Sequence, residues 1–194
     1  MELTEIEQKI RVGLKKLMKK AELLWPGERA QVLERNLTHY VGAGMMGFGV
    51  VYEYPFRPER NAKRWKRLDM VAFDPSGRVL VLAESKRLLK EVDAGVARVK
   101  GDVEKIKEAS KKLRCWNYGK GKEESLCGAV TLGVLLVSVS GDRRVAAQRR
   151  EKLSSDVGLG GWPTPVSHSD GTYHALYKVW KLKPRRAQAG RREA

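Results

Sequence analysis

The 194-residue sequence has few aromatic residues and only two cysteines. Phe, Trp and Tyr make up 7% of the chain against 42% for all hydrophobic residues, so we expect a mostly aliphatic core. Cys115 and Cys127 are too few for a disulfide framework, which predicts a cytoplasmic protein with reduced thiols. Zinc sites use more closely spaced cysteine pairs than these two, so no zinc site is expected.

Long apolar runs are also missing. No stretch of about 18 apolar residues is present, which argues against a transmembrane helix and a membrane partner. The first 20 residues lack the apolar segment of a secretory signal, and no internal repeat is visible. We expect one domain over residues 1–183 and a basic, disordered tail over residues 184–194.

Acidic residues are in deficit. The chain has 39 Lys and Arg but 23 Asp and Glu, a formal net charge of +16. A polyanionic partner is favoured because each neutralised phosphate releases condensed counterions. A solubilising surface or association with ribosomes is the alternative, but the clustering of the basic residues favours nucleic acid.

The hydrophobic pattern predicts an alternation of helices and strands. Helical spacing covers residues 4–24, 27–41, 92–113 and 143–153, and strand patterns cover residues 50–56, 68–74, 79–86, 129–140 and 172–183. Loops are expected over residues 57–67 and 114–128. The central order is helix, three strands, helix, strand, which predicts an α/β sandwich with a mixed sheet. The strand at 129–140 is expected beside the strand at 79–86.

The strand at 79–86 ends in two charged residues, Glu84 and Lys86, after an aliphatic run. Residues two apart in a strand face the same side, so these two side chains point together, and Ser85 faces the other way. The PSGR turn at residues 75–78 makes the strands at 68–74 and 79–86 a hairpin. Asp69 is then expected roughly opposite Glu84.

Two neighbouring carboxylates repel each other, and a divalent cation removes this repulsion. One or two carboxylates with retained water are typical of a Mg²⁺ site, in which Mn²⁺ can substitute. An adjacent lysine can orient the attacking water or neutralise charge on a phosphate. The three residues therefore indicate hydrolysis of a phosphodiester. A plain salt bridge at a strand end is the alternative interpretation.

The segment RLDMVAFDPSGRVLVLAESK, residues 67–86, resembles the core motif of the PD-(D/E)XK nuclease superfamily. The resemblance implies a restriction-endonuclease-like αβββαβ core over about residues 27–140, with a mixed central sheet flanked by helices and an extra N-terminal helix. It implies that Asp69, Glu84 and the main-chain carbonyl of Ser85 hold the metal and that Lys86 assists catalysis. Leu68 stands where the family motif has proline. A further acid on the preceding helix would be Glu34, with Glu28 less suitable.

The function implied is a Mg²⁺-dependent DNA endonuclease, with structure-specific cleavage favoured because no separate recognition domain is visible. RNA as a partner and a homodimer stay open. Phosphate contacts are predicted from basic residues around Trp65, which can stack a base, and after the motif. These basic residues are Arg57, Arg60, Lys63, Arg64, Lys66, Arg67, Arg87 and Lys90.

Two further functions compete with the nuclease. A nucleic-acid-binding protein that retains the nuclease fold without catalysis would share the motif and the charge. An oxidoreductase is suggested by Gly42, Gly44 and Gly47, which match G-x-G-x-x-G. That fingerprint needs a strand before it and a helix after it, whereas here a helix precedes and a strand follows. No nucleotide cofactor is therefore expected, and His39 is interpreted as a structural or surface residue.

Overall fold

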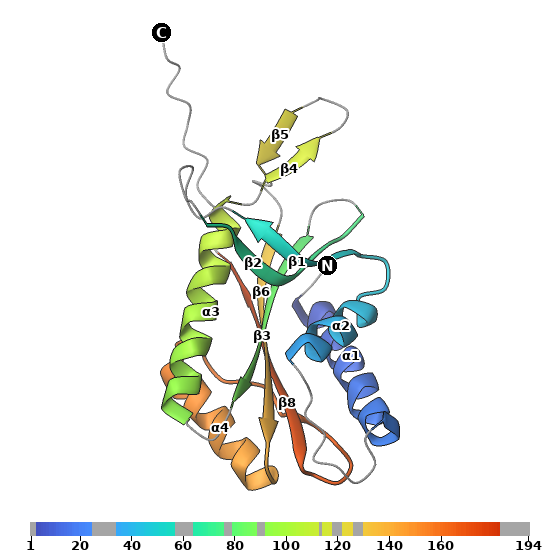
Figure 1. Ribbon diagram of the computed structural model, residues 1–194, viewed down its shortest axis with the longest axis vertical. Helices are drawn as coiled ribbons and strands as arrows, with labels where there is room; N and C mark the ends of the chain where they lie inside the picture. Colours follow the sequence, from blue (N-terminus) through green and yellow to red (C-terminus); the bar gives the residue numbers. More distant parts are fainter. Residues whose placement is uncertain are drawn as a thin grey trace.

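The computed structural model describes residues 3–24, 34–56, 64–75, 79–88, 92–112, 114–117, 122–125 and 130–182. One mixed six-stranded sheet forms the centre of the fold (Figure 1). In spatial order it contains β1 (Gly49–Phe56), β2 (Lys66–Phe73), β3 (Val79–Leu88), β6 (Val130–Ser140), β8 (Tyr173–Lys181) and β7 (Val166–Ser167). The predicted α/β class with a mixed sheet is confirmed.

Neighbouring strands pair in both directions. β1, β2 and β3 form an antiparallel meander, β6 runs parallel to β3, and β8 runs antiparallel to β6. A parallel pair needs a long crossover connection, and α3 (Val92–Lys112) supplies most of it. The remainder contains a separate hairpin of β4 (Arg114–Asn117) and β5 (Lys122–Ser125). The predicted place of the strand at 129–140, beside the strand at 79–86, is confirmed.

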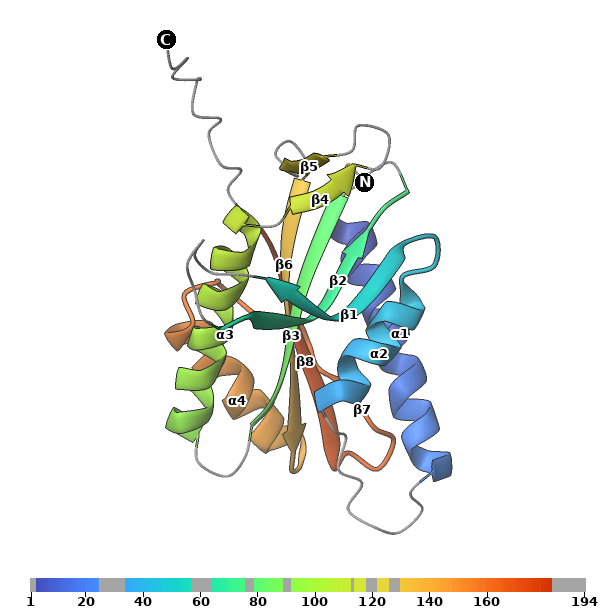
Figure 2. The same cartoon turned by 45° about the horizontal axis from the view of Figure 1, so that its top comes forward.

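Helices cover both faces of the sheet (Figures 1 and 2). α1 (Leu3–Leu24) and α2 (Glu34–Gly44) lie on one face, and α3 and α4 (Arg143–Asp156) lie on the other. Buried side chains of β3 alternate between the two sides: Val81 packs with α1 and α2, and Leu82 packs with α3. A strand buried on both faces reads as a continuous aliphatic run, which is the pattern of residues 79–83.

Buried apolar faces hold the helices against the sheet. In α1, Ile6, Ile10 and Leu14 recur every fourth residue and have no exposed surface. α4 begins after Asp142, whose side chain accepts a hydrogen bond of 2.8 Å from the backbone N–H of Val145. Every described helix is too short or too polar to span a lipid bilayer.

The turn between β2 and β3 fixes the register of the hairpin. The Asp74 carboxylate accepts a 2.8 Å hydrogen bond from the backbone N–H of Val79, whose carbonyl accepts one of 3.1 Å from the Asp74 N–H. The pairs then run from Phe73 opposite Leu80 to Met70 opposite Ala83. The next two positions are residues 69 and 84, as predicted from the turn.

Glycines let α1 and α2 approach each other closely. A Cβ added to Gly13 of α1 would overlap the backbone carbonyl of Tyr40, and one added to Gly44 of α2 would lie 2.7 Å from the carbonyl of Lys9. Backbone atoms of packed helices cannot move aside cheaply, so these two positions exclude larger residues.

We expect Gly13→Ala to destabilise the protein by about 1–3 kcal/mol, because the overlap outweighs the gain in helix propensity. Gly101→Ala in α3 is the matched control, since an added Cβ meets no atom within 4 Å there. It is expected to stabilise by about 0.5–1 kcal/mol. Thermal or denaturant unfolding of both variants measures the difference, and equal shifts would contradict the close contact of α1 with α2.

The structure corrects some predicted boundaries. The second helix is described from residue 34, with residues 27–33 outside the described part, and it continues through Gly44 instead of ending before the glycine-rich segment. The segment at 114–128, predicted as a loop, contains β4 and β5. Lys66 and Arg67 belong to β2 instead of the loop before it. The predicted tail at 184–194 lies outside the described residues.

Candidate functional site

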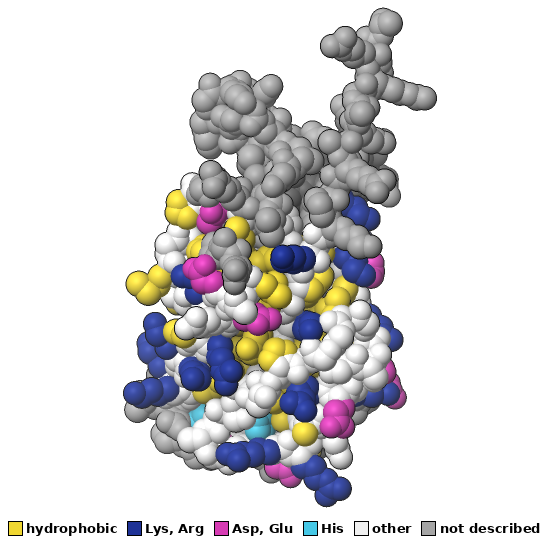
Figure 3. All heavy atoms as spheres, turned by 180° about the vertical axis from the view of Figure 1, so that it is seen from behind, with side chains coloured by type: hydrophobic (Ala, Val, Ile, Leu, Met, Phe, Trp, Pro, Cys, Tyr) yellow, Lys and Arg dark blue, Asp and Glu magenta, His cyan; other side chains and the backbone are white. Residues whose placement is uncertain are grey.

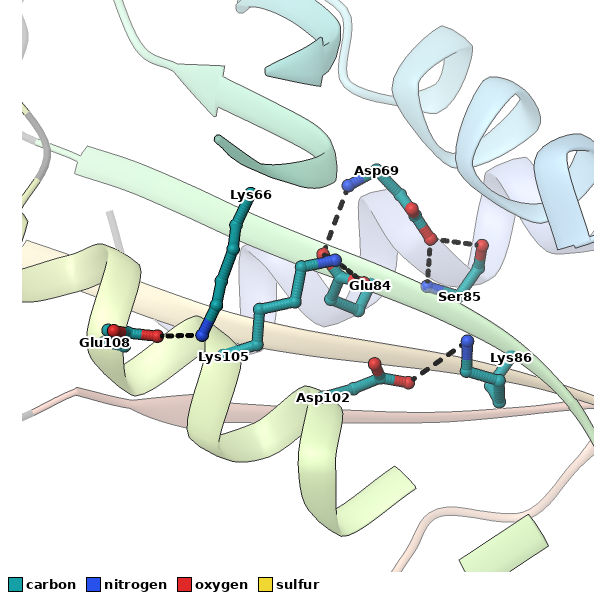
Figure 4. Close-up of polar contacts among 8 residues, drawn as sticks. All are labelled: Lys66, Asp69, Glu84, Ser85, Lys86, Asp102, Lys105 and Glu108. Carbon is teal, nitrogen blue, oxygen red and sulfur yellow. Dashed lines mark hydrogen bonds and ion pairs between the residues drawn. The ribbon is translucent and has the colours of Figure 1, made fainter. Parts of the chain in front are cut away.

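The backbone pairing of β2 with β3 ends before Asp69, and there the Asp69 side chain forms the hydrogen bonds to β3. Its Oδ2 accepts hydrogen bonds from the backbone N–H of Ser85 at 2.7 Å and from the Ser85 hydroxyl at 2.8 Å. The backbone N–H of Asp69 points to Oε1 of Glu84 at 3.3 Å (Figure 4). The expected neighbours are therefore together, with the Asp69 carboxylate directed at Ser85.

Asp69 also marks a switch of faces in the β1–β2 hairpin. Residues two apart in a regular strand face the same side, but Met70 packs with α1 and α2 whereas Leu68 packs with α3. β1 makes the same switch across from Asp69, at Glu53, whose φ is 51°. Such a φ is uncommon for a residue other than glycine. The outer half of the hairpin thus bends across the sheet towards α3 (Figure 2).

Glu84 lies between β3 and α3, and only 2% of its surface is exposed. The Lys105 ammonium contacts its carboxylate at 2.8 Å. Burial, and then the Asp69 charge, raise the pKa of Glu84 from 4.5 to about 8, although Lys105 acts in the opposite direction. One lysine thus leaves the repulsion between the two carboxylates only partly offset, so a further cation at this position is favourable.

Lys86 faces α3 on the same side of β3 as Glu84. Its Nζ lies 3.6 Å from Oδ2 of Asp102, which is an ion-pair distance but too long for a hydrogen bond. This buried oxygen has no hydrogen-bond partner among the described residues. Burial raises the pKa of Asp102, while the Lys86 and Lys105 charges lower it. The Lys86 side chain is 24% exposed, so part of it is open to solvent.

A pocket of about 310 Å³ opens on the other side of Asp69, the side of α2. The ring of His39 stacks on that of Tyr52 at its wall, with centroids 4.3 Å apart and planes 12° apart. The Tyr52 hydroxyl donates a 3.3 Å hydrogen bond to the His39 carbonyl. The lining residues are Thr38 and His39 of α2, Tyr52 and Glu53 of β1, Arg67 and Asp69 of β2, and Ser85 of β3.

Four of the predicted site residues are together in the structure: Asp69, Glu84, Ser85 and Lys86. Glu84 and Lys86 share a face of β3, as predicted. Glu34 is the first residue of α2, and its side chain lies outside the described part, as does all of Glu28.

The predicted nucleic-acid contacts are only partly described. Arg57, Arg60, Lys63 and Lys90 lie outside the described residues. Arg64, Trp65, Lys66 and Arg67 are exposed at the start of β2, and Arg87 is half-buried on β3. Lys66 binds Glu108 of α3 at 2.7 Å, so its charge is already engaged within the protein. Arg67 lines the pocket beside Asp69.

Sequence reasoning missed Asp102 and Lys105, which bring α3 into the site. Both lie next to the apolar positions Val99, Val103 and Ile106 along the helix, so they stand at the edge of its buried face. An acid and a base at the edge of an apolar helix face could have indicated, from the sequence alone, that α3 contributes to the site. The pocket gave no such signal, because its walls come from four separate elements.

Among the residues that the structure describes, no group of three or more His, Cys, Asp or Glu is arranged to hold a metal ion by itself. Mg²⁺ in phosphoryl-transfer sites is bound by one or two carboxylates together with substrate phosphates and water. Asp69 and Glu84 fit this mode, since both offer hard oxygen ligands and their mutual repulsion favours a cation. Comparisons of the chain with protein-family models, curated proteins and solved structures find no match.

Proposed function

We propose that this protein is a Mg²⁺-dependent DNA endonuclease with a restriction-endonuclease-like core, in which Mn²⁺ can replace Mg²⁺. The observation that carries the proposal is the register of Asp69 with Glu84, with Lys86 two residues further on the same face of β3. The order α2, β1, β2, β3, α3, β6 supports it, because it repeats the helix, three strands, helix, strand of the family that the motif resembles.

The residues divide into metal ligands and residues that act on the substrate. Asp69, Glu84 and the main-chain carbonyl of Ser85 would hold the ion, which supplies Lewis acidity towards a phosphate and a lowered pKa of bound water. Lys86 would orient the attacking water or offset the charge that develops on the phosphate. Glu34 remains a candidate for a second ion or for orienting Lys86.

α3 contributes two further charged residues to the site, on the side that faces Glu84 and Lys86 of β3. Asp102 holds the ammonium of Lys86 in place, and Lys105 holds the carboxylate of Glu84 (Figure 4). Side chains fixed by such neighbours meet the geometric requirements of catalysis better than free ones do. We therefore assign Asp102 and Lys105 positioning roles in the proposed nuclease.

The surface supports a nucleic-acid partner. Lys and Arg side chains spread over the face seen in Figure 3 and outnumber the acidic side chains there. On α1 the exposed basic residues are Arg11, Lys15, Lys16, Lys19 and Lys20. Arg64 and Trp65 are exposed just before β2, where they can contact a phosphate and a base. A basic surface of this kind binds a DNA backbone without regard to sequence.

One observation favours a second function, a nucleic-acid-binding protein without catalysis. Both Glu84 and Lys86 are paired with side chains of α3, which is also the arrangement of a purely structural ion-pair network. The exposed fraction of Lys86 and the pocket at Asp69 favour the nuclease instead, since both give a substrate access.

Cleavage assays decide between the two functions. The full chain is incubated with linear, supercoiled, single-stranded and branched DNA in Mg²⁺ or Mn²⁺, and in EDTA. We expect metal-dependent cleavage by the wild-type protein and none by Asp69→Asn purified in the same way. Cleavage that persists in EDTA or in the variant would contradict the proposed site, and binding of DNA without any cleavage would support the second function.

A further inference from the structure

The pocket at Asp69 adjoins the residues that the proposed chemistry uses, and it shares Asp69 and Ser85 with them. Glu84 and Lys86 face α3, whereas the pocket opens on the side of α2. Asp69 is common to both, because it lies where β2 leaves β3 and where the hairpin switches faces. A ligand in the pocket would therefore reach the proposed site through Asp69.

The size of the pocket limits its ligand. A volume of about 310 Å³ lies at the lower end of the range of small-molecule sites. It admits a single nucleotide, but not a base pair with its two strands. In a duplex the bases present only their edges in the grooves, so a base can enter a pocket only after it leaves the stack.

The walls combine groups that recognise the parts of a nucleotide. His39 is exposed and already stacked on Tyr52, so one face of its ring remains for a base. Bases in unpaired strands stack on aromatic side chains, His among them. Arg67, also exposed, offers a forked donor for a phosphate.

Glu53 gives the pocket a polarity. It is an exposed residue held at a φ of 51°, and a strained backbone conformation of this kind is concentrated at ligand sites. A carboxylate accepts hydrogen bonds from the amino groups of bases. Glu53 and Arg67 therefore favour opposite ends of the same nucleotide.

We propose that this pocket binds one unpaired nucleotide of a DNA strand, with its base stacked on His39 and its phosphate at Arg67 beside Asp69. The assignment rests on the proposed nuclease function and narrows its substrate class. The preferred substrates are DNAs with unpaired nucleotides, such as single strands, flaps and the splayed arms of branches. A fully paired duplex is a poor substrate, because it must first release a base.

Binding measured in EDTA tests the pocket without any cleavage. Fluorescence anisotropy compares a short single-stranded oligonucleotide with the matched duplex, for the wild-type protein and three variants. His39→Ala is expected to lower the affinity for the single strand by about 5- to 150-fold, the range for loss of one stacked base, and to leave duplex affinity nearly unchanged. His39→Phe retains an aromatic ring and is expected to bind the single strand like the wild type. His168→Ala, a histidine outside the pocket, is the matched control.

Each outcome separates the pocket from the chemistry. Equal effects of His39→Ala on single strand and duplex, or no effect on either, would overturn the assignment, as would a loss in His39→Phe as large as that in His39→Ala. If the wild-type protein cleaves no DNA but His39→Ala selectively loses single strands, the pocket stands and the nuclease proposal fails. If the wild-type protein cleaves DNA but His39→Ala shows no selective loss, the nuclease proposal stands and the pocket assignment fails.

Discussion

Replacement of Lys86 by alanine is expected to slow DNA cleavage by about 10²- to 10⁴-fold, the range for a positioned proton-transfer or charge-stabilising group. Lys86 follows Glu84 by two residues on the same face of β3, and part of its side chain is accessible. DNA affinity should hardly change, because one cation is a small part of a net charge of +16. Single-turnover cleavage and anisotropy in EDTA measure the two quantities separately.

The controls address folding as well as charge. Lys86→Ala leaves Asp102 without its ion-pair partner, and a buried unpaired carboxylate is destabilising. The double variant Lys86→Ala/Asp102→Asn removes that cost and should remain inactive with a recovered melting temperature. Lys111→Ala, an exposed residue of α3, should cleave normally. Retained cleavage in the double variant, or a loss of affinity as large as the loss of rate, would rule out the proposed role of Lys86.

Local features made much of the fold predictable from the sequence. The turn after Asp74 closes the β2–β3 hairpin, so counting from it placed Asp69 opposite Glu84. α3 has a long apolar stripe with period 3.6, and residues 132–139 form a run buried on both faces. Such long periodic segments leave few alternatives, because each must bury one whole face or both.

Non-local packing decided what the sequence did not reveal. α2 continues through Gly44, which lies directly against α1, and no sequence pattern reports the position of a neighbouring helix. The switch of faces at Glu53 and Asp69 depends on the hairpin bending towards α3. The hydrophobic pattern of β1 or of β2 alone does not indicate this switch of faces.

The candidate site shows the same division. The types and spacing of Asp69, Glu84 and Lys86 could be read from one hairpin. The burial of Glu84 could not, because it depends on α3, which supplies Lys105 and Asp102 from about 20 residues further along the chain. The motif thus indicated which residues meet, and only the fold revealed that Glu84 is buried and that its pKa is raised.

Replacement of Glu84 by glutamine is expected to abolish cleavage and to stabilise the protein. Glu84 is buried, and its pKa is raised to about 8 from 4.5, first by burial and then by Asp69. The folded state thus favours the protonated form. The contribution of Glu84 to the free energy of unfolding is fully present below about pH 4.5. It falls as the pH rises towards 8 and is constant above that value. Glutamine cannot ionise, so the free energy of unfolding of the variant does not fall in this way as the pH rises.

The stability difference between variant and wild type should therefore grow with pH. Without metal, in EDTA, we expect it to be small near pH 4.5 and to reach about 2–3 kcal/mol by pH 8, less than the full linkage value because Lys105 loses its partner. Denaturant unfolding across this range measures it. Glu104→Gln, with 71% of its side chain exposed, should change stability by less than about 0.5 kcal/mol at every pH.

The combination of the two effects is the informative result. A residue that lowers stability at neutral pH persists when function requires it, so a variant that is more stable and inactive identifies Glu84 as a functional carboxylate. A variant that is less stable at pH 8 would show that the ion pair with Lys105 outweighs burial. A pH-independent difference would show that Glu84 titrates near its ordinary value, and the electrostatic argument for a cation between Glu84 and Asp69 would then fail.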